Sequence, residues 1–350
     1  MVPITASFIS EAPLHPKAAE LLALLFDKGW SDPAKIHNSS REAGRLIQEA
    51  KESFAGAFGL RTDEIYFLGE PPLGFHLGIN GLLSESSTLY YSPTDRAPVH
   101  AIVDDRRNRA LQVSAHEPVN SERSDLLVFQ STNPETGIQK ELPQNFLGNI
   151  FVDNTSYGLS AALPDRWSSA MWQSRSWDGP GGLGVFALKT GMGWRNPLPH
   201  NDASKVPQSF SIPLALASAV ALEAFRSEAQ SSKEIISHFK KSLVQFLINE
   251  VGGIIAADDG RESSPYLLSL IFEGIDSERL VHALSERGLD VDSGSACISA
   301  NLQPSHVLAA MGLPTTGNIR ITLHHQTTEE DLDLLMHNLK ELVIRQRSEN

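Results

Sequence analysis

The stretch SGSACISANLQPSHVLAAMGLPTTGNIRITLHHQTTEEDLD, residues 293–333, decides the fold because several structural signals follow one another within it. Small residues surround Cys297 and predict a loop, since serine and glycine offer no apolar face to bury. A short helix is expected after Pro304, a strand over Asn318–Leu323 and a final helix from Thr328. The Cys297 sulfur should therefore be reachable, and a reachable thiolate can act as a nucleophile or a sulfur carrier.

The residues before this stretch extend the pattern into a compact α+β unit. Gly252-Gly253 interrupts a long helical period, after which two strands, a helix and another strand are expected. They cover Ile254–Ala257, Tyr266–Phe272, Ser277–Arg287 and Leu289–Asp292. We therefore predict a small α+β C-terminal domain over residues 252–350, joined by the N-terminal segment 1–14.

Residues 15–251 show strands alternating with helices, which indicates a large α/β domain. The clearest helix covers Ser39–Phe58, where apolar residues share one face and Ser39 with Glu42 predicts a capping box. Helical periods also fill Ile212–Phe225 and Lys233–Val251. Strands are expected over Ile65–Leu68, Thr88–Tyr91, His100–Val103, Leu126–Gln130, Asn149–Asp153 and Leu183–Leu188. The alternation predicts a mainly parallel sheet with helices on both faces.

The composition limits the partners of the chain. Its 350 residues carry 29 basic and 42 acidic side chains, a net charge of −13, which disfavours nucleic acid or an anionic membrane as the partner. The N-terminal residues contain no basic and apolar signal segment, and no run approaches the ~20 apolar residues that span a bilayer. We expect a cytoplasmic, acidic globular protein of about two domains. The single cysteine excludes an internal disulfide.

Residues 293–333 resemble the C-terminal segment of cysteine desulfurases, which are class V aminotransferases of the pyridoxal phosphate (PLP) fold type I. The cysteine loop, the Pro-Ser-His-Val-Leu helix start, the strand arginine and the Thr-Thr-Glu-Glu helix start follow in the same order. The resemblance implies that Cys297 carries the substrate sulfur as a persulfide and that Arg320 binds the substrate carboxylate. Taken alone, a strand arginine is also typical of a surface ion pair. A weaker similarity upstream includes DPAKIHNSSREAGR, residues 32–45.

The resemblance also implies a lysine that holds PLP as an imine, but Ser176 occupies the corresponding position. In the family this lysine stands in a Ser-x-His-Lys run just before a Gly-Pro-x-Gly-x-Gly turn. The turn remains here as Gly179–Gly184, whereas the run reads Gln173-Ser174-Arg175-Ser176. A serine hydroxyl cannot form an imine, and Lys189 lies beyond the following strand, too far along the chain to replace the lysine.

The phosphate site implied by the family is changed as well. Residues Leu68–Leu73 stand where a helix N-terminus should receive the phosphate through free backbone N–H groups. Pro71 and Pro72 each remove one N–H group, and Glu70 adds a negative charge. All of these changes oppose phosphate binding.

Other positions implied by the resemblance are retained. Asp153, at the end of a strand, corresponds to the partner of the pyridine nitrogen, and His100 corresponds to the imidazole that stacks on the ring. Asn133 corresponds to an asparagine of the substrate site. From the residue types alone, Asp153 is equally typical of a helix cap and His100 of a half-buried imidazole.

Three functions follow from these residues. The first is a degenerate desulfurase-like protein that has lost imine catalysis, holds no PLP, and keeps Cys297 as a sulfur carrier or a remnant. The second is an active PLP-dependent desulfurase or aminotransferase with an unrecognised lysine. The third is a binding or regulatory subunit that pairs with an active desulfurase paralogue, either relaying sulfur or serving as a scaffold. The expected partners are a second copy of the chain in a homodimer, or the active paralogue in a heterodimer, together with a sulfur-acceptor protein. No metal site is expected, because the His324-His325 pair has no ligand partner at a recognisable spacing.

Overall fold

The computed structural model describes residues 6–11, 13–27, 29–113, 120–159, 162–199, 206, 209–294 and 304–349. Cys297 lies outside the described residues. The chain divides into two compact units. The sheet unit comprises Leu14–Ser131 and Lys140–Ser227, and the C-terminal unit comprises Met1–Pro13, Thr132–Gln139 and Glu228–Asn350.

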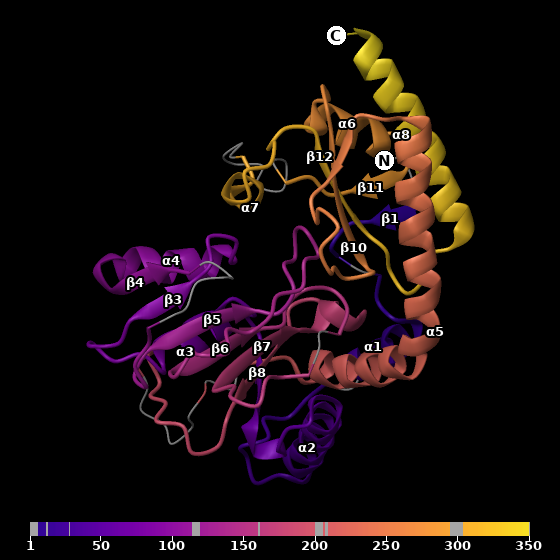
Figure 1. Ribbon diagram of the computed structural model, residues 1–350. Coiled ribbons are helices and arrows are strands. Elements are labelled where there is room, and N and C mark those ends of the chain that lie inside the picture. Colours follow the sequence, from indigo (N-terminus) through magenta and orange to yellow (C-terminus); the bar gives the residue numbers. More distant parts are fainter. Residues whose placement is uncertain are drawn as a thin grey trace. The chain divides into compact units, whose positions relative to one another are not determined.

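A seven-stranded sheet forms the sheet unit, with strand order β2-β8-β7-β6-β5-β3-β4 (Figure 1). Strand β8 runs antiparallel to both of its neighbours, and the other paired strands are parallel. The strands are β2 (Ile65–Leu68), β3 (Leu89–Tyr91), β4 (Ala110–Gln112), β5 (Leu126–Gln130), β6 (Asn149–Asp153), β7 (Ser169–Gln173) and β8 (Gly184–Leu188). The prediction of a mainly parallel α/β sheet is confirmed.

Helices pack on both faces of this sheet. The helices of the unit are α1 (Pro16–Phe26), α2 (Asn38–Phe58), α3 (Leu73–Asn80), α4 (Ala97–Asp105) and the first part of α5 (Ile212–Glu250). Successive residues of a strand point to opposite faces, and Met171 and Trp172 follow one another in β7. Gly74 of α3 packs against Met171, whereas Phe58 of α2 stacks on Trp172 with ring centroids 4.4 Å apart. Helices α2 and α3 therefore cover opposite faces.

The C-terminal unit contains a three-stranded antiparallel sheet of order β12-β10-β9 and a parallel pair of β1 with β11. Its strands are β1 (Ala6–Phe8), β9 (Ile254–Ala256), β10 (Leu267–Phe272), β11 (Leu289–Val291) and β12 (Asn318–Thr322). Its helices are the second part of α5, α6 (Ser277–Ser285), α7 (His306–Ala310) and α8 (Glu329–Glu349). Each strand and helix predicted after Gly252 is present, with bounds that differ by a few residues.

One strand predicted in the sheet unit was wrong. Residues His100–Val103 lie in helix α4, not in a strand. Pro98 lies in the first turn of this helix, and Val99, Ile102 and Val103 share its buried face at helical spacing.

The predicted capping box of Ser39 and Glu42 does not form. Helix α2 begins one residue earlier, and its N-cap residue, His37, makes no side-chain capping bond. The Ser39 hydroxyl instead accepts a hydrogen bond from the Ser31 hydroxyl at 2.7 Å. The two helical periods after Ile212 join into one helix, α5, because the residues between them include no glycine or proline to end it.

Candidate functional site

The polar ends of three neighbouring strands meet in the sheet unit. Gln130, Asp153 and Gln173 are the last residues of β5, β6 and β7. These strands are parallel, so their carboxyl ends lie at the same edge of the sheet. This edge is where open α/β sheets bind ligands.

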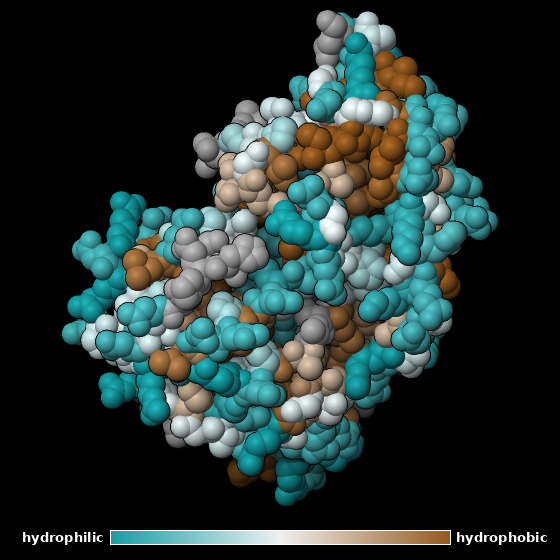
Figure 2. All heavy atoms as spheres, in the orientation of Figure 1, coloured by the Kyte–Doolittle hydropathy of each residue, from teal (hydrophilic) through white to brown (hydrophobic). Residues whose placement is uncertain are grey.

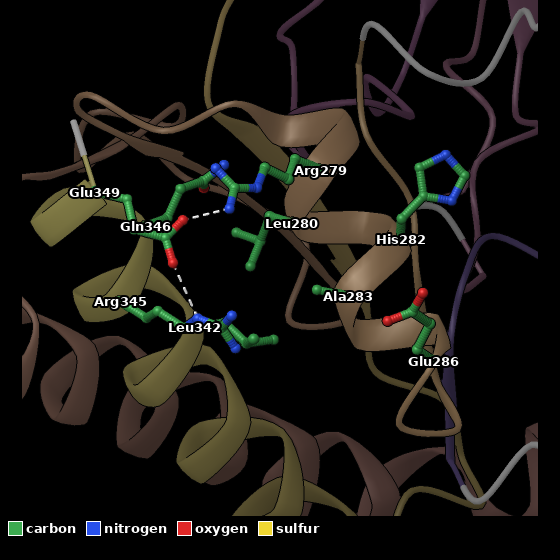
Figure 3. Close-up of a pocket in the computed structure, with 9 residues that line it drawn as sticks. All are labelled: Arg279, Leu280, His282, Ala283, Glu286, Leu342, Arg345, Gln346 and Glu349. Atoms are coloured by element: carbon green, nitrogen blue, oxygen red, sulfur yellow. Dashed lines mark hydrogen bonds and ion pairs between the residues drawn. The ribbon is translucent and has the colours of Figure 1, made fainter.

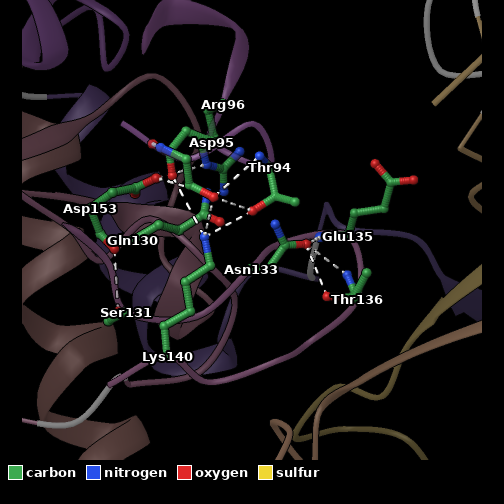
Figure 4. Close-up of polar contacts among 11 residues, drawn as sticks. Thr94, Asp95, Arg96, Gln130, Ser131, Asn133, Glu135, Thr136, Lys140 and Asp153 are labelled. Carbon is green, nitrogen blue, oxygen red and sulfur yellow. Dashed lines mark hydrogen bonds and ion pairs between the residues drawn. The ribbon is translucent and has the colours of Figure 1, made fainter. Parts of the chain in front are cut away.

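Asp153 is buried and its carboxylate has protein partners on both oxygens. Oδ1 accepts hydrogen bonds from the Thr155 backbone N–H at 2.9 Å and from the Thr155 hydroxyl at 2.6 Å. Oδ2 accepts a bond from Gln130 Nε2 at 3.4 Å and lies 3.5 Å from Arg96 Nε (Figure 4). The charge partner of Asp153 is therefore a guanidinium of the same chain.

The Thr155 carbonyl oxygen is a common hydrogen-bond acceptor for three side chains near this ion pair. It accepts hydrogen bonds from Arg96 Nη2 at 3.1 Å, Gln173 Nε2 at 2.7 Å and Ser176 Oγ at 3.2 Å. Ser176, the predicted imine position, is buried and donates its hydroxyl to this backbone oxygen. The Arg96 guanidinium thus connects the carboxylate of Asp153 with the carbonyl to which Ser176 is bonded.

A second ion pair, Asp95 with Lys140, lies in the same cluster (Figure 4). Lys140 Nζ donates to Thr94 Oγ1 at 2.9 Å and to Ser92 Oγ at 3.3 Å, and it lies 3.7 Å from Asp95 Oδ1. Burial raises the pKa of Asp95 to about 7, against the opposing attraction of Lys140. Burial also lowers the pKa of Lys140, while Asp95 and Asp153 oppose that change. We call the residues Ser92, Thr94, Asp95, Arg96, Gln130, Lys140 and Asp153 the Asp153 cluster.

Sequence reasoning missed Asp95, Arg96 and Lys140. A signal for two of them was present, since Asp95 and Arg96 lie between strand β3 and the Pro98 helix start, on the same side of the sheet as the strand ends. His100 lies on α4, and its ring packs edge-to-face on Tyr91 with centroids 5.8 Å apart. The side chain that meets Asp153 is that of Arg96.

The start of α3 provides the test for a phosphate group. The backbone N–H groups of Leu73, Gly74 and Phe75 donate to the carbonyls of residues 70, 71 and 72 at 3.0 to 3.2 Å. The N–H of Gly69 donates to the Ser209 carbonyl at 3.0 Å. Anion binding at a helix N-terminus needs free N–H groups, and these four are bonded within the chain.

The residues at the predicted positions therefore do not fit PLP held by an imine and a helix-bound phosphate. Ser176 supplies a hydroxyl in place of an amine. The amides at the start of α3 are bonded internally, and Asp153 already has a guanidinium partner.

Two further predicted residues lie in the C-terminal unit. Arg320 is on β12, and its Nη2 lies 4.0 Å from Asp292 Oδ2, while the two residues also exchange backbone hydrogen bonds. Asn133 closes a turn: its side-chain oxygen accepts bonds from the N–H groups of Glu135 and Thr136 and from the Thr136 hydroxyl. The structure thus holds both side chains in defined local contacts.

A surface pocket of ≈ 270 Å³ lies between α6 and α8 of the C-terminal unit (Figure 3). Arg279 and Arg345, which both pair with Glu349, line it together with Leu280 and Leu342. These arginines are more than half exposed, which is typical of surface ion pairs.

The described ranges contain no group of three or more His, Cys, Asp or Glu side chains that could hold a metal ion. No helix in these ranges combines the length and apolar character needed to cross a membrane.

Comparisons with known proteins agree with the fold. The family model for aminotransferase class V matches residues 207–335. The cysteine desulfurase of Trichormus azollae is 24% identical over 372 residues, which cover 96% of this chain and 91% of that protein. The cysteine desulfurase of Gluconacetobacter diazotrophicus is 27% identical over 371 residues, which cover 95% and 92%.

Solved structures show the same architecture. A NifS-like protein superposes with a TM-score of 0.84 at 19% identity, covering 97% of this chain and 99% of the other. The NifS-like protein from Rickettsia africae ESF-5 gives a TM-score of 0.81 at 15% identity, covering 96% and 98%. The mainly parallel sheet, the C-terminal unit and the sequence similarity agree: this chain has the fold of NifS-like proteins, its sequence is similar to those of cysteine desulfurases, and residues 207–335 match the aminotransferase class V model.

Proposed function

We propose that this chain is a cysteine desulfurase-like protein that has lost imine catalysis with PLP. One observation carries the proposal: the Arg96 guanidinium pairs with Asp153 and shares the Thr155 carbonyl with Ser176. A coenzyme ring held between Asp153 and residue 176 would have to displace that guanidinium. Fold alone does not establish the activity, so the proposal depends on these side chains.

The remaining role is that of a sulfur carrier or a partner subunit. In the carrier role, the Cys297 thiolate attacks the outer sulfur of a donor persulfide, the donor thiolate leaves, and Cys297 becomes the persulfide.

Exposed apolar side chains favour a second chain as partner: Leu24, Phe26 and Ile36 are 69%, 62% and 90% exposed. We propose a homodimer or a heterodimer with an active paralogue. Sulfur transfer that survives in a Cys297→Ser variant would eliminate the carrier role.

The second candidate is an active PLP enzyme that uses Lys140. This lysine lies in the Asp153 cluster, and its lowered pKa favours the neutral amine that attacks a carbonyl. Lys189, by contrast, donates to the Asp165 carbonyl and lies over the Trp167 ring. Lys140 is therefore the lysine that must be tested first.

Covalent labelling distinguishes the two candidates. The purified chain is incubated with PLP, its absorption near the visible edge is recorded, and the sample is reduced with borohydride and mapped by mass spectrometry. We expect no absorption band from an imine, and no more label on Lys140 than on Lys189. A band that is present in the native chain, maps to Lys140 and disappears in Lys140→Arg but not in Lys189→Arg would establish the second candidate.

A further inference from the structure

We propose that Asp153 and the Thr155 carbonyl form a binding site for a planar guanidinium-type cation, and that Arg96 of the same chain fills it. The proposal rests on the proposed function in one respect, because an imine-bound coenzyme would require the same carboxylate. It adds the chemical class of the occupant and names the side chain that supplies it.

The first argument is the direction of the donors. Arg96 Nε lies 3.5 Å from Asp153 Oδ2, and Nη2 donates to the Thr155 carbonyl at 3.1 Å. These two nitrogens lie on one edge of the planar guanidinium, which spans both acceptors with a hydrogen bond to the carbonyl and an ion pair to the carboxylate. A compact ammonium is a point charge without such an edge, so the site favours a planar cation.

The second argument is that both acceptors are held in place by other residues. Thr155 binds Asp153 Oδ1 through its N–H and hydroxyl, and Gln130 donates to Oδ2. Gln173 and Ser176 both donate to the Thr155 carbonyl. The acceptor pair is therefore preorganised by groups that do not depend on Arg96.

The third argument is the difference in exposure between the two partners. The Asp153 side chain is 3% exposed, whereas that of Arg96 is 28% exposed. A buried carboxylate without a cation is strongly destabilising. The carboxylate thus belongs to the interior, and the cation enters from the solvent side. A free guanidinium of the same shape should be able to follow the same path when Arg96 is shortened.

Chemical rescue of Arg96→Ala tests the proposal. We expect the melting temperature of this variant to fall by several degrees and to recover by at least half in millimolar methylguanidinium. Methylammonium at equal ionic strength should give no comparable recovery. Arg96→Lys should remain destabilised, because a compact ammonium lacks the planar edge that meets the Thr155 carbonyl and the Asp153 carboxylate together. Millimolar guanidinium compounds are too dilute to act as denaturants.

Two control variants fix the interpretation. Arg106 lies at the other end of α4, and its Nη2 donates to the Ser84 carbonyl. The Arg106→Ala variant should show no selective response to methylguanidinium. Asp153→Asn combined with Arg96→Ala should abolish the rescue. If Arg96→Ala is insoluble, the yield of refolding with methylguanidinium or methylammonium gives the same comparison.

The outcomes separate this proposal from the proposed function. Equal effects of the two cations, or an Arg96→Ala variant as stable as the native chain, would overturn the guanidinium site. Neither result depends on PLP. Conversely, a PLP imine in the native chain would overturn the proposed function, whatever the rescue experiment shows.

Discussion

Asp95 and Lys140 form a buried pair whose protonation follows from their surroundings. The Asp95 side chain is 1% exposed, and its Oδ2 accepts the Ser92 N–H at 2.7 Å. Burial disfavours the ionised carboxyl, and the nearby Asp153 carboxylate acts in the same direction, while Lys140 and the Ser92 bond oppose them. We therefore predict that the Asp95 carboxyl titrates near neutral pH.

We predict that replacing Asp95 by Asn changes the pH dependence of stability. Between its ordinary pKa of 3.8 and about 7, the carboxyl is ionised in the unfolded chain but protonated in the folded one. The folded state then binds more protons, so the free energy of unfolding of the native chain falls as pH rises through this interval. Relative to Asp95→Asn, the loss should be on the order of 2–4 kcal/mol by pH 8. Urea unfolding at several pH values measures it.

The control for this prediction is Asp104→Asn, which changes an exposed carboxylate on α4. Titrating groups that do not interact with Asp95 are common to the native chain and the variant and cancel in the difference. An Asp95→Asn difference that stays flat from pH 4 to pH 8 within error, like that of the control, would contradict the buried titration.

At the scale of elements, glycines set how closely α3 approaches the sheet. A methyl group at Gly78 would overlap Cε2 of Phe151 and lie 3.2 Å from Cε2 of Phe186. The Gly78 carbonyl also accepts a hydrogen bond from the Ser169 hydroxyl at 3.0 Å. Glycine at this position therefore permits a close contact between helix and sheet.

We predict opposite effects of alanine at two helical glycines. Gly78→Ala should lower the free energy of unfolding by roughly 1–3 kcal/mol, because overpacking outweighs the better helix propensity. Gly56→Ala, in α2 with no atom within 4 Å of its added methyl group, should raise it by about 0.5–1 kcal/mol. Thermal unfolding of both variants tests the pair, and a stabilising Gly78→Ala would show that α3 can move away from the sheet.

At the scale of the whole molecule, segments far apart in the sequence build the C-terminal unit. Strand β1 pairs in parallel with β11, and His324, which follows β12, interacts with the backbone of Ile9. Burial lowers the pKa of His324 to about 4, with the Ile9 bond opposing and His325 adding to this change. On the face shown in Figure 2, most of the surface is hydrophilic, in agreement with the acidic composition.

We predict that His324 makes the chain sensitive to acid. Between pH 6.5 and about 4 the unfolded chain takes up a proton on this residue and the folded chain does not. Stability should therefore fall with pH in this interval, by up to about 3 kcal/mol from this group. His324→Gln should reduce the loss, whereas His282→Gln, on an exposed histidine, should not. Equal acid profiles for the native chain and His324→Gln would refute the assignment.

The sequence determined by itself the order of the strands and helices after Gly252, the mainly parallel sheet and the family resemblance. These properties depend on local periodicity, on Gly and Pro positions and on short motifs such as the one after Pro304. The family resemblance also identified Ser176 and Asp153 as positions of interest, through the retained turn at Gly179–Gly184 and the strand that ends at Asp153.

Only the tertiary structure decided that Arg96 and Lys140 join Asp153. The three residues come from separate parts of the chain, and pairing of the parallel strands β3, β5 and β6 brings those parts to one sheet edge. Packing likewise decided that residues His100–Val103 form a helix and not a strand. A short apolar run is compatible with either periodicity, and only its tertiary contacts determine which side chains are buried. Contacts between distant side chains are set by topology, and local sequence patterns do not encode them directly.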